Sequence, residues 1–287
     1  MKYRFMESYG SGFTVKKMCL ALRVDLSGYY GYLRRGLCQR YEDDEGLLRK
    51  IKEIWRWSRG VYGSPRITAE LRAQGARHGK NRISRLMREN GIKARTRKRF
   101  KITTKSDHDL PVAPDLVGRD FSARHPDEIW LSDITYIWTW EGWLYLSVVM
   151  DVFNREIVGW ALHDRLKKEL VVTALCKALV NRDPHPGLIF HSDRGSQYAS
   201  HEAGKILEAR GIRQSMCGKG NCYDNAMMES FFSSLKKELV RLQTFHSRSQ
   251  AHRSVFEYIE IFYNRQRRHS SLNYMTPVEY YREASQT

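Results

Sequence analysis

The chain has 287 residues, of which 28% are charged and 41% apolar, and its formal net charge is +17 at pH 7. This length is enough for two or three domains, and the composition is typical of a globular chain. The sequence lacks both the run of about 20 apolar residues that spans a bilayer and a signal peptide, which excludes a membrane or secreted protein and predicts a cytoplasmic one.

The excess of positive charge lies in the N-terminal part. Residues 1–120 hold 28 Lys and Arg against 13 Asp and Glu, whereas the rest of the chain has a net charge of only +2. Such asymmetry is the electrostatic footprint of a phosphate-binding module, although a solvated basic surface also accounts for it. We favour nucleic acid as the partner of this region.

Residues 1–40 are predicted to form a helical segment. Apolar residues recur at helical spacing from Val15 to Leu22, after Thr14, which is a suitable N-cap. The stretch VDLSGYY breaks this pattern, and a second short helix can begin near Ser27. Two short helices with a tight break are typical of a helix-turn-helix, although any small helical hairpin has the same pattern.

Residues 41–95 have clearer signals of a helix-turn-helix domain. The stretch DDEGLLRKIKEIWRW places its apolar residues on one helical face, and Pro65 is suited to the first position of a second helix. The stretch NRISRLMRENG combines an apolar stripe with a basic face formed by Arg82, Arg85 and Arg88. A short basic helix after a turn is typical of a DNA-reading helix; a solvated charged face is the alternative.

Residues 96–125 are predicted to be a basic linker. The stretch KARTRKRFKITTK, residues 93–105, is densely basic and has no apolar periodicity, and several prolines follow it. Such a segment can lie along a phosphate backbone, and we include Lys98 among the candidate DNA-binding residues.

Residues 126–245 change to an α/β pattern. The stretches EIWLSDITYIW, WLYLSVVMDV and EIVGWAL are separated by short turns and predict an antiparallel meander. The helical pattern KKELVVTALCKALVNR and the short apolar run GLIFHSD then predict a right-handed crossover that joins parallel neighbours. A further helix and the short strand IRQSM complete a mixed α/β domain, in which helices cover a central sheet.

Two acids stand on strands of this predicted sheet. Asp193 comes just past the end of a short buried strand, where ligands gather in open α/β sheets. Asp133 lies within the first strand, and the strand-helix-strand crossover could bring the strands of the two acids side by side. Its neighbours in the sequence are mostly apolar, and an unpaired carboxylate is costly in such a setting. It needs an arginine or a metal ion as a partner. Asp133 can therefore be either a structural acid or a metal ligand. For His191, a structural place beside the site is favoured over a role at a phosphate.

A third acid follows a glycine-containing loop. The stretch CGKGNCYDNAMMESFFSSLKKELVRLQ becomes helical near Asn225, and Glu229 stands at the edge of its apolar face. Lys236 returns to the same side of the helix, on the order of 10 Å further along. Cys217 and Cys222 are loosely spaced like zinc ligands, but no second Cys or His pair stands at finger spacing. The odd total of five cysteines argues against a disulfide framework.

Three acids on three separate elements can converge on hard cations. Mg²⁺ takes oxygen ligands and readily bridges to phosphate, and Mn²⁺ accepts similar ligands. Two such ions about 4 Å apart can activate a nucleophilic oxygen and stabilise the leaving oxygen of an in-line displacement. This chemistry suits a basic chain that binds DNA.

Residues 246–287 are predicted to be a C-terminal helical extension. The basic stretch YNRQRRHSS, residues 263–271, can grip DNA through Arg267, or can simply be a polar helix end. The stretch TPVE has the pattern of a capping box at the start of a last helix.

The spacing of the three acids and three longer motifs carry a family resemblance. Asp133 and Asp193 are 60 positions apart, and 35 residues lie between Asp193 and Glu229. Together with HSDRGSQYAS, GNCYDNAMMESFFSSLKKE and YNRQRRHSSLNYMTPVEYY, in this order, they closely resemble the second-frame transposases of the large frameshifting family of bacterial insertion sequences. The resemblance covers nearly the whole chain. It implies a retroviral-integrase-like core with the ribonuclease-H-like fold, a mixed α/β sheet flanked by helices, preceded by small all-α helix-turn-helix domains.

The resemblance also implies roles for the site residues. Asp133, Asp193 and Glu229 match the family's DDE triad, which would hold two Mg²⁺ ions, with Mn²⁺ as a substitute, in the active complex. Lys236 matches a basic residue expected to contact the transposon end. The implied activity is cleavage at the 3′ ends of an insertion sequence and transfer of those ends to a target.

The implied partners follow from that activity. They are double-stranded DNA of the terminal inverted repeats and of the target, further copies of the chain in a homo-oligomer on DNA, and an upstream-frame product as a fusion partner. The resemblance places the chain in a bacterial cytoplasm, at the nucleoid when bound to DNA. Two rival functions fit the same residues: a non-catalytic DNA-binding regulator of transposition, and a metal-dependent nuclease that cuts without joining.

Overall fold

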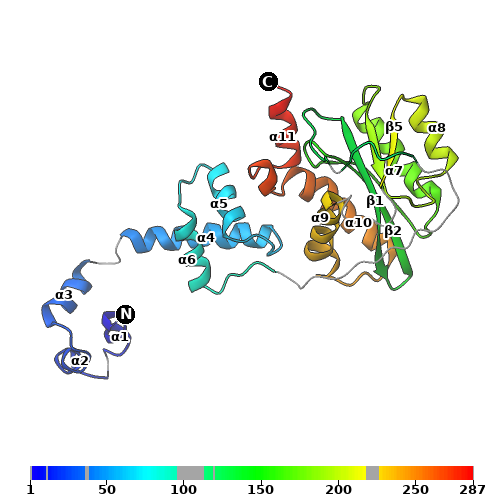
Figure 1. Ribbon diagram of the computed structural model, residues 1–287. Helices are drawn as coiled ribbons and strands as arrows, with labels where there is room; N and C mark the ends of the chain where they lie inside the picture. Colours follow the sequence, from blue (N-terminus) through cyan, green and yellow to red (C-terminus); the bar gives the residue numbers. More distant parts are fainter. Residues whose placement is uncertain are drawn as a thin grey trace.

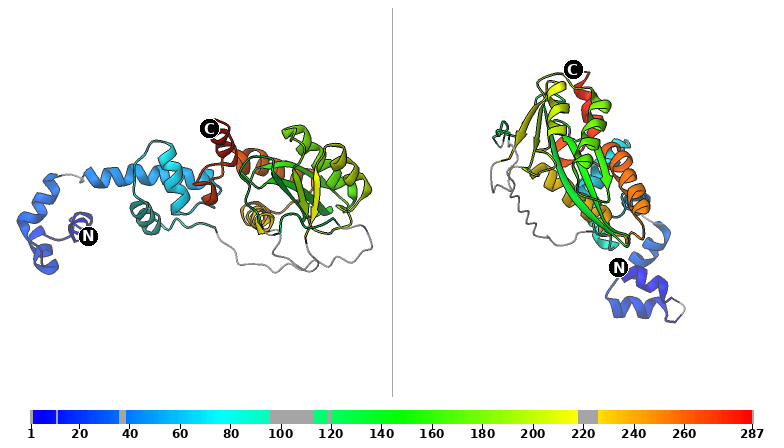
Figure 2. Two further views of the ribbon diagram at one scale, coloured as in Figure 1. Left: turned by 45° about the horizontal axis from the view of Figure 1, so that its top comes forward. Right: turned by 90° about the vertical axis from the view of Figure 1, so that its right-hand side faces the viewer.

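The computed structural model describes residues 2–10, 12–35, 39–95, 113–118, 120–217 and 226–286. These parts form an elongated molecule, with the N-terminal helices at one end and an α/β core at the other (Figure 1, Figure 2). Helices near the C-terminus lie between the helical domain and the core. Across the described ranges, every helix is too short or too polar to span a bilayer.

Three short helices form the N-terminal segment: α1 (Lys2–Ser8), α2 (Val15–Leu22) and α3 (Leu26–Arg35). Thr14 takes the N-cap position of α2, and Arg23 ends the helix in the left-handed conformation. A small cluster of buried side chains joins the three helices, consisting of Met6, Met18, Cys19 and Tyr29. The sequence pattern predicted α2 and α3 but not α1.

Three further helices pack around one core: α4 (Gln39–Trp57), α5 (Ser64–Ala73) and α6 (Lys80–Glu89). Pro65 stands in the first turn of α5, where its missing N–H leaves no helical hydrogen bond unmade. The buried side chains of these helices are Leu47, Ile51, Ile54, Ile67, Leu71, Ile83, Leu86 and Met87. Those of α4 and α6 belong to the apolar stripes from which these two helices are predicted, whereas α5 is predicted from Pro65 at its start.

One five-stranded sheet forms the core, in the order β3-β2-β1-β4-β5. The strands are β1 (Ile129–Thr139), β2 (Gly142–Asp151), β3 (Ile157–His163), β4 (Ile189–Ser192) and β5 (Arg213–Met216). The first three strands form the predicted antiparallel meander, and β4 pairs in parallel with both β1 and β5.

The crossover after the meander pairs β4 with β1. Helix α7 (Lys168–Arg182) connects β3 to β4, and β4 lies along the edge of β1 that β2 leaves open. The prediction that the crossover can bring the strand of Asp133 beside the strand that ends before Asp193 is confirmed. This pairing matters for function, because it determines where the two aspartates lie.

Helices cover both faces of the sheet. Helices α7 and α8 (His201–Ala209) share a buried cluster with Trp130, whereas α9 (Ala226–Leu235) belongs to the cluster that contains Leu131. Successive side chains of a strand point to opposite faces, so Asp133 lies on the α9 side with Leu131. Gly159 on β3 allows α7 to approach closely, because a Cβ there would collide with the carbonyl oxygen of Ala174.

The C-terminal extension is helical but irregular. Helix α9 continues into the π-helical turn η2 (Lys236–Val240), and α10 (Arg248–Phe256) continues into η3 (Glu257–Tyr263). After the 3₁₀ turn η4 (Ser270–Leu272), α11 (Pro277–Ala284) begins with the predicted capping box of Thr276 and Glu279. The architecture confirms the predicted fold class of a helix-covered mixed sheet preceded by small helical domains.

Arg268 joins this extension to the helical domain. Its backbone N–H donates to the hydroxyl oxygen of Tyr62 at 2.8 Å, and its guanidinium lies 2.9 Å from Glu70 on α5 and 2.7 Å from Glu279. The C-terminal extension therefore bridges the helical domain and the α/β core.

Candidate active site

The parallel pairing of β1 and β4 brings two acids together. Ser132 and Ser192 are partners in the register, and each is followed directly by an aspartate, Asp133 or Asp193. Neighbouring strands lie about 4.8 Å apart, so the two aspartates emerge side by side at the carboxyl end of β4. The negative charge of Asp193 accordingly raises the pKa of Asp133.

Helix α9 brings the third acid to the same side of the sheet. Its buried residues Met228, Phe231 and Phe232 belong to the cluster that contains Leu131. Glu229 stands in the first turn of α9 and is exposed. Its charge is close enough to raise the pKa of Asp133 as well. The three acids, which are far apart in the sequence, therefore interact electrostatically.

The setting of Asp133 is unfavourable for a negative charge. Burial is the largest cause that raises its pKa, to about 7, and repulsion from Asp193 comes next. The backbone N–H of Ile134, which donates to Oδ1 at 2.7 Å, and the charge of Lys236 act in the opposite direction. These two favourable contacts do not offset the burial and the repulsion.

The donor set fits a divalent cation, although the acids do not form a closed site. Among the described residues, no group of three or more His, Cys, Asp or Glu side chains lies close enough to enclose an ion. Mg²⁺ commonly binds through one or two carboxylates and keeps several waters, so a closed cage is not required. A cation between the acids would relieve the repulsion that raises the pKa of Asp133.

Replacing Asp133 with asparagine is expected to flatten the pH dependence of stability in the presence of a chelator. The folded pKa of about 7 lies above the unfolded value of about 3.9. The folded chain therefore binds this proton more tightly, and stability is lost as pH rises from about 4 through about 7. The loss is on the order of a few kcal/mol, at about 1.4 kcal/mol per pK unit.

Urea unfolding of both proteins at about pH 5 and about pH 8 measures this effect. Asp151, whose pKa burial also raises to about 7, is present in both proteins, so their difference isolates Asp133. Equal pH dependence in the two proteins would contradict the desolvated setting of Asp133.

Lys236 lies close enough to Asp133 for their charges to interact. It opens the π-helical turn η2, and its Nζ stands 5.2 Å from the ring centroid of Tyr136 on β1. Burial and the charge of Arg241 lower the pKa of Lys236, whereas Asp133 raises it. A half-buried cation next to the acids is well placed for a phosphate that approaches them.

The residues behind Asp193 support the end of β4. His191 is buried, with Nδ1 2.9 Å from the hydroxyl of Ser215 and Nε2 3.2 Å from Sγ of Cys217, which agrees with its structural interpretation. The backbone N–H of Gly195 donates to Oδ1 of Asp193 at 2.9 Å. Cys222, the other half of the zinc-like pair, lies outside the described residues.

Sequence reasoning missed Tyr198. It is completely buried, and its hydroxyl lies 3.0 Å from the hydroxyl of Ser132 on β1. The charges of Asp193 and Asp133 help to raise its pKa. Its position within HSDRGSQYAS was the available signal, but an aromatic residue after a turn is usually a core residue, and it is that here too.

The candidate DNA-binding arginines of α6 already have acidic partners. Nε of Arg82 and Nη2 of Arg85 each lie 2.6 Å from a carboxylate oxygen of Asp44 on α4, and Arg85 also pairs with Glu89. Arg88 is exposed. The DNA contacts of this helix stay a prediction.

The two other DNA-binding candidates are Arg267 and Lys98. Arg267 is buried, and its Nε and Nη2 each lie 2.8 Å from a carboxylate oxygen of Glu238. This ion pair accounts for the residue without DNA. Lys98 lies outside the described residues.

Comparisons with known proteins agree with this architecture. An HTH-like domain model matches residues 42–100, and two integrase core domain models match residues 123–222 and 210–277. The insertion element IS600 uncharacterized 31 kDa protein of Shigella sonnei is 43% identical over 92% of this chain and 97% of its own. Transposase InsF for insertion sequence IS3A of Escherichia coli (strain K12) is 39% identical over 98% of each chain.

Among solved structures, the HTLV-2 integrase catalytic core domain in complex with magnesium matches with a TM-score of 0.44 and 15% identity. It covers 56% of this chain and 99% of that one. The family resemblance of the motifs is confirmed by the full-length relatives. The chain belongs to the IS3 family of transposases, with an integrase catalytic core preceded by a helix-turn-helix-like domain.

Proposed function

We propose that this transposase is a DDE polynucleotidyl transferase that cuts the 3′ ends of an insertion sequence and joins them to target DNA with Asp133, Asp193 and Glu229. The observation that supports the proposal is the register of β1 and β4, in which Ser132 pairs with Ser192 and each serine is followed directly by an aspartate. Glu229 is close enough to raise the pKa of Asp133. The interval of 35 residues between Asp193 and Glu229 agrees with the DDE pattern.

The three carboxylates would hold Mg²⁺, with Mn²⁺ as a substitute and two ions in the active complex. Bound there, the ions would stabilise the attacking and leaving oxygens of an in-line displacement. Asp133 must be ionised to serve as a ligand, and a neighbouring cation favours that form. Water would first break a phosphodiester at the element's end, and the freed 3′-hydroxyl would then attack a phosphodiester of the target.

DNA binding would involve most of the chain. The domain of residues 41–95 and the linker of residues 96–125 would bind the terminal inverted repeats. The candidate contacts are Arg88, which is exposed, and Lys98. Lys236 would contact the transposon end at the core of residues 126–245. Two further segments would take part in DNA binding: the N-terminal helical segment, residues 1–40, and the C-terminal extension, residues 246–287.

The proposed reaction also implies protein partners. Two element ends must be held together for joining, so we propose a homo-oligomer on DNA. An upstream-frame product would be a fusion partner of the chain.

With Mg²⁺, the full-length chain is expected to cut a duplex that carries the terminal repeats of its element and to join the 3′ ends to a second duplex. A chelator should remove both products, because no cation would then stabilise the attacking and leaving oxygens of the displacement. Denaturing gels of end-labelled duplexes measure both steps, and a duplex with scrambled repeats is the control. Binding without cleavage would indicate a regulator instead, and cleavage without joining would indicate a nuclease.

A further inference from the structure

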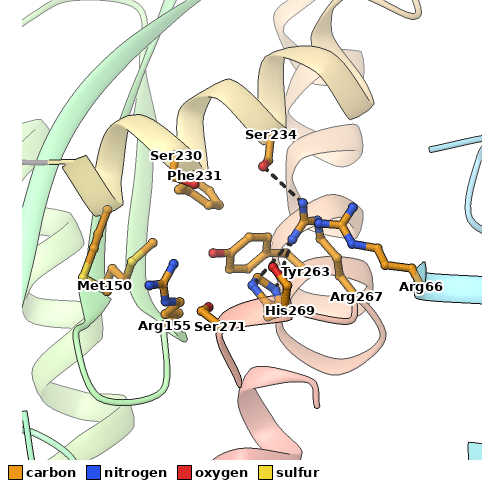
Figure 3. A pocket seen from close by; sticks show the side chains of 12 residues that line it. Arg66, Met150, Arg155, Ser230, Phe231, Ser234, Tyr263, Arg267, His269 and Ser271 are labelled. Atoms are coloured by element: carbon orange, nitrogen blue, oxygen red, sulfur yellow. Dashed lines mark hydrogen bonds between the residues drawn. The ribbon is translucent and has the colours of Figure 1, made fainter. Parts of the chain in front are cut away.

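A polar cavity of about 100 Å³ lies beside the proposed active site (Figure 3). It is formed where α9, the turn between β2 and β3, α5 and the C-terminal extension meet. Ser230 and Ser234 of α9 line it, and Ser230 follows Glu229 directly in the sequence. The cavity therefore shares α9 with Glu229, one of the three proposed catalytic acids, which does not line it.

Positive charge exceeds negative charge around this cavity. Arg66, Arg155 and Arg267 line it. Glu238 lies 2.8 Å from Arg267 and 3.7 Å from Arg66, and Arg155 has no ion pair within the described part of the chain. Two of the guanidinium groups thus share one carboxylate, and the third has none within the described residues. The three arginines together exceed Glu238 by two positive charges, which remain for a ligand.

The titration of His269 indicates the same positive potential. This buried side chain also lines the cavity. Burial lowers its pKa well below the usual range, and the charges of Arg267, Arg66 and Arg155 lower it further. An anion in the cavity would experience the opposite, favourable interaction with these arginines.

The mouth of the cavity offers uncharged hydrogen-bond donors. Ser230, Ser270 and Ser271 are exposed there. None of their hydroxyl groups has a hydrogen-bond partner in the parts of the chain that the structure describes. Hydroxyl and guanidinium groups are the usual partners of phosphate oxygens.

Arg155 occupies an unusual backbone position. Its φ is 59°, in the left-handed region that non-glycine residues seldom adopt. Figure 3 shows its guanidinium beside Ser271, on the opposite side of Tyr263 from Arg66. Strained residues of this kind cluster at ligand sites, and no ion pair within the described residues explains an arginine here.

We propose that this cavity binds one phosphate group, held by Arg155 and the hydroxyl groups of Ser230 and Ser271. A neutral or cationic ligand would leave the excess positive charge unmatched. The place beside Glu229 favours a backbone phosphodiester of bound DNA, and in that form the inference rests on the proposed function. A free phosphate would bind through the same groups, so the two sources need separate measurements.

The first measurement uses inorganic phosphate and the full-length chain. At saturation, phosphate is expected to raise the Tm by at least about 2 °C over chloride at equal ionic strength. Arg155→Gln should abolish this rise. Arg265→Gln, at an exposed arginine that does not line the cavity, should retain it. Arg155→Lys keeps the positive charge and should retain part of it.

The second measurement uses a duplex with the terminal repeats, in a chelator so that no cutting occurs. Arg155→Gln is expected to weaken binding and to reduce the slope of log K against log salt by about 0.9, the value for one phosphate contact. A change in this slope identifies a DNA phosphodiester, and a change confined to the Tm identifies free phosphate.

The inference is overturned if Arg155→Gln matches the wild type in both measurements, or matches Arg265→Gln in both. Neither measurement depends on cleavage, so the cavity can fail while the proposed reaction succeeds, and the reaction can fail while the cavity binds phosphate.

Discussion

Replacing Asp193 with asparagine is expected to abolish both cleavage and strand transfer while DNA binding persists. The substitution keeps the shape of the side chain, and its amide oxygen can still accept the N–H of Gly195, which donates to Oδ1 at 2.9 Å. It removes one of the two charges that β1 and β4 place side by side. Metal ions supply several kcal/mol of transition-state stabilisation, so the rate should fall on the order of a thousandfold or more.

Asp183→Asn is the matched control for this substitution. Asp183 lies at the end of α7, before β4 begins, with its side chain 83% exposed, whereas Asp193 follows the other end of β4. Its replacement should leave cleavage, joining and binding unchanged, as measured on the same labelled duplex. If the Asp193→Asn protein cut at the wild-type rate, the assignment of the triad would be wrong.

The pairing that places these aspartates together was only partly predictable from the sequence. Local pattern indicated the meander, the crossover helix and the short strand that ends before Asp193. It also indicated that the crossover could bring this short strand beside the strand of Asp133, but it did not give the register of the pair. A further signal supports this pairing: the start of β1, including Trp130 and Leu131, is buried on both faces, and such continuous apolar runs are typical of interior strands.

The roles of several arginines could not be predicted, because their partners are distant in sequence. Arg267 stands in a basic stretch that suggested DNA binding or a polar helix end, but its carboxylate partner is Glu238 on η2, before α10 and η3 in the chain. Arg82 and Arg85 form a basic face on α6, but Asp44 of α4 lies against it. Composition reports the charges on a segment, whereas only packing decides which of them are already paired.

Replacing Glu238 with glutamine is expected to destabilise the chain by about 3–5 kcal/mol, the cost of breaking a buried ion pair from one side. Both oxygens of Glu238 accept hydrogen bonds from Arg267 at 2.8 Å. The hydroxyl of Tyr258 donates to Oε2 at 2.9 Å. Without this carboxylate, the guanidinium of Arg267 would remain buried with no negative partner, and Arg66 of α5 would lose the charge that lies 3.7 Å away.

Glu257→Gln separates the effect of burial from the loss of a charge. Glu257 also pairs with an arginine, Arg59, but at 3.9 Å and with its side chain 59% exposed, and exposed pairs contribute about 0–1 kcal/mol. Urea unfolding should therefore give a much lower midpoint for Glu238→Gln than for Glu257→Gln, with similar slopes. Similar midpoints would mean that the buried network around Glu238 does not hold the C-terminal extension to α5 and α9. A large difference would show that the basic motif of residues 263–271 stabilises the fold before any DNA is bound.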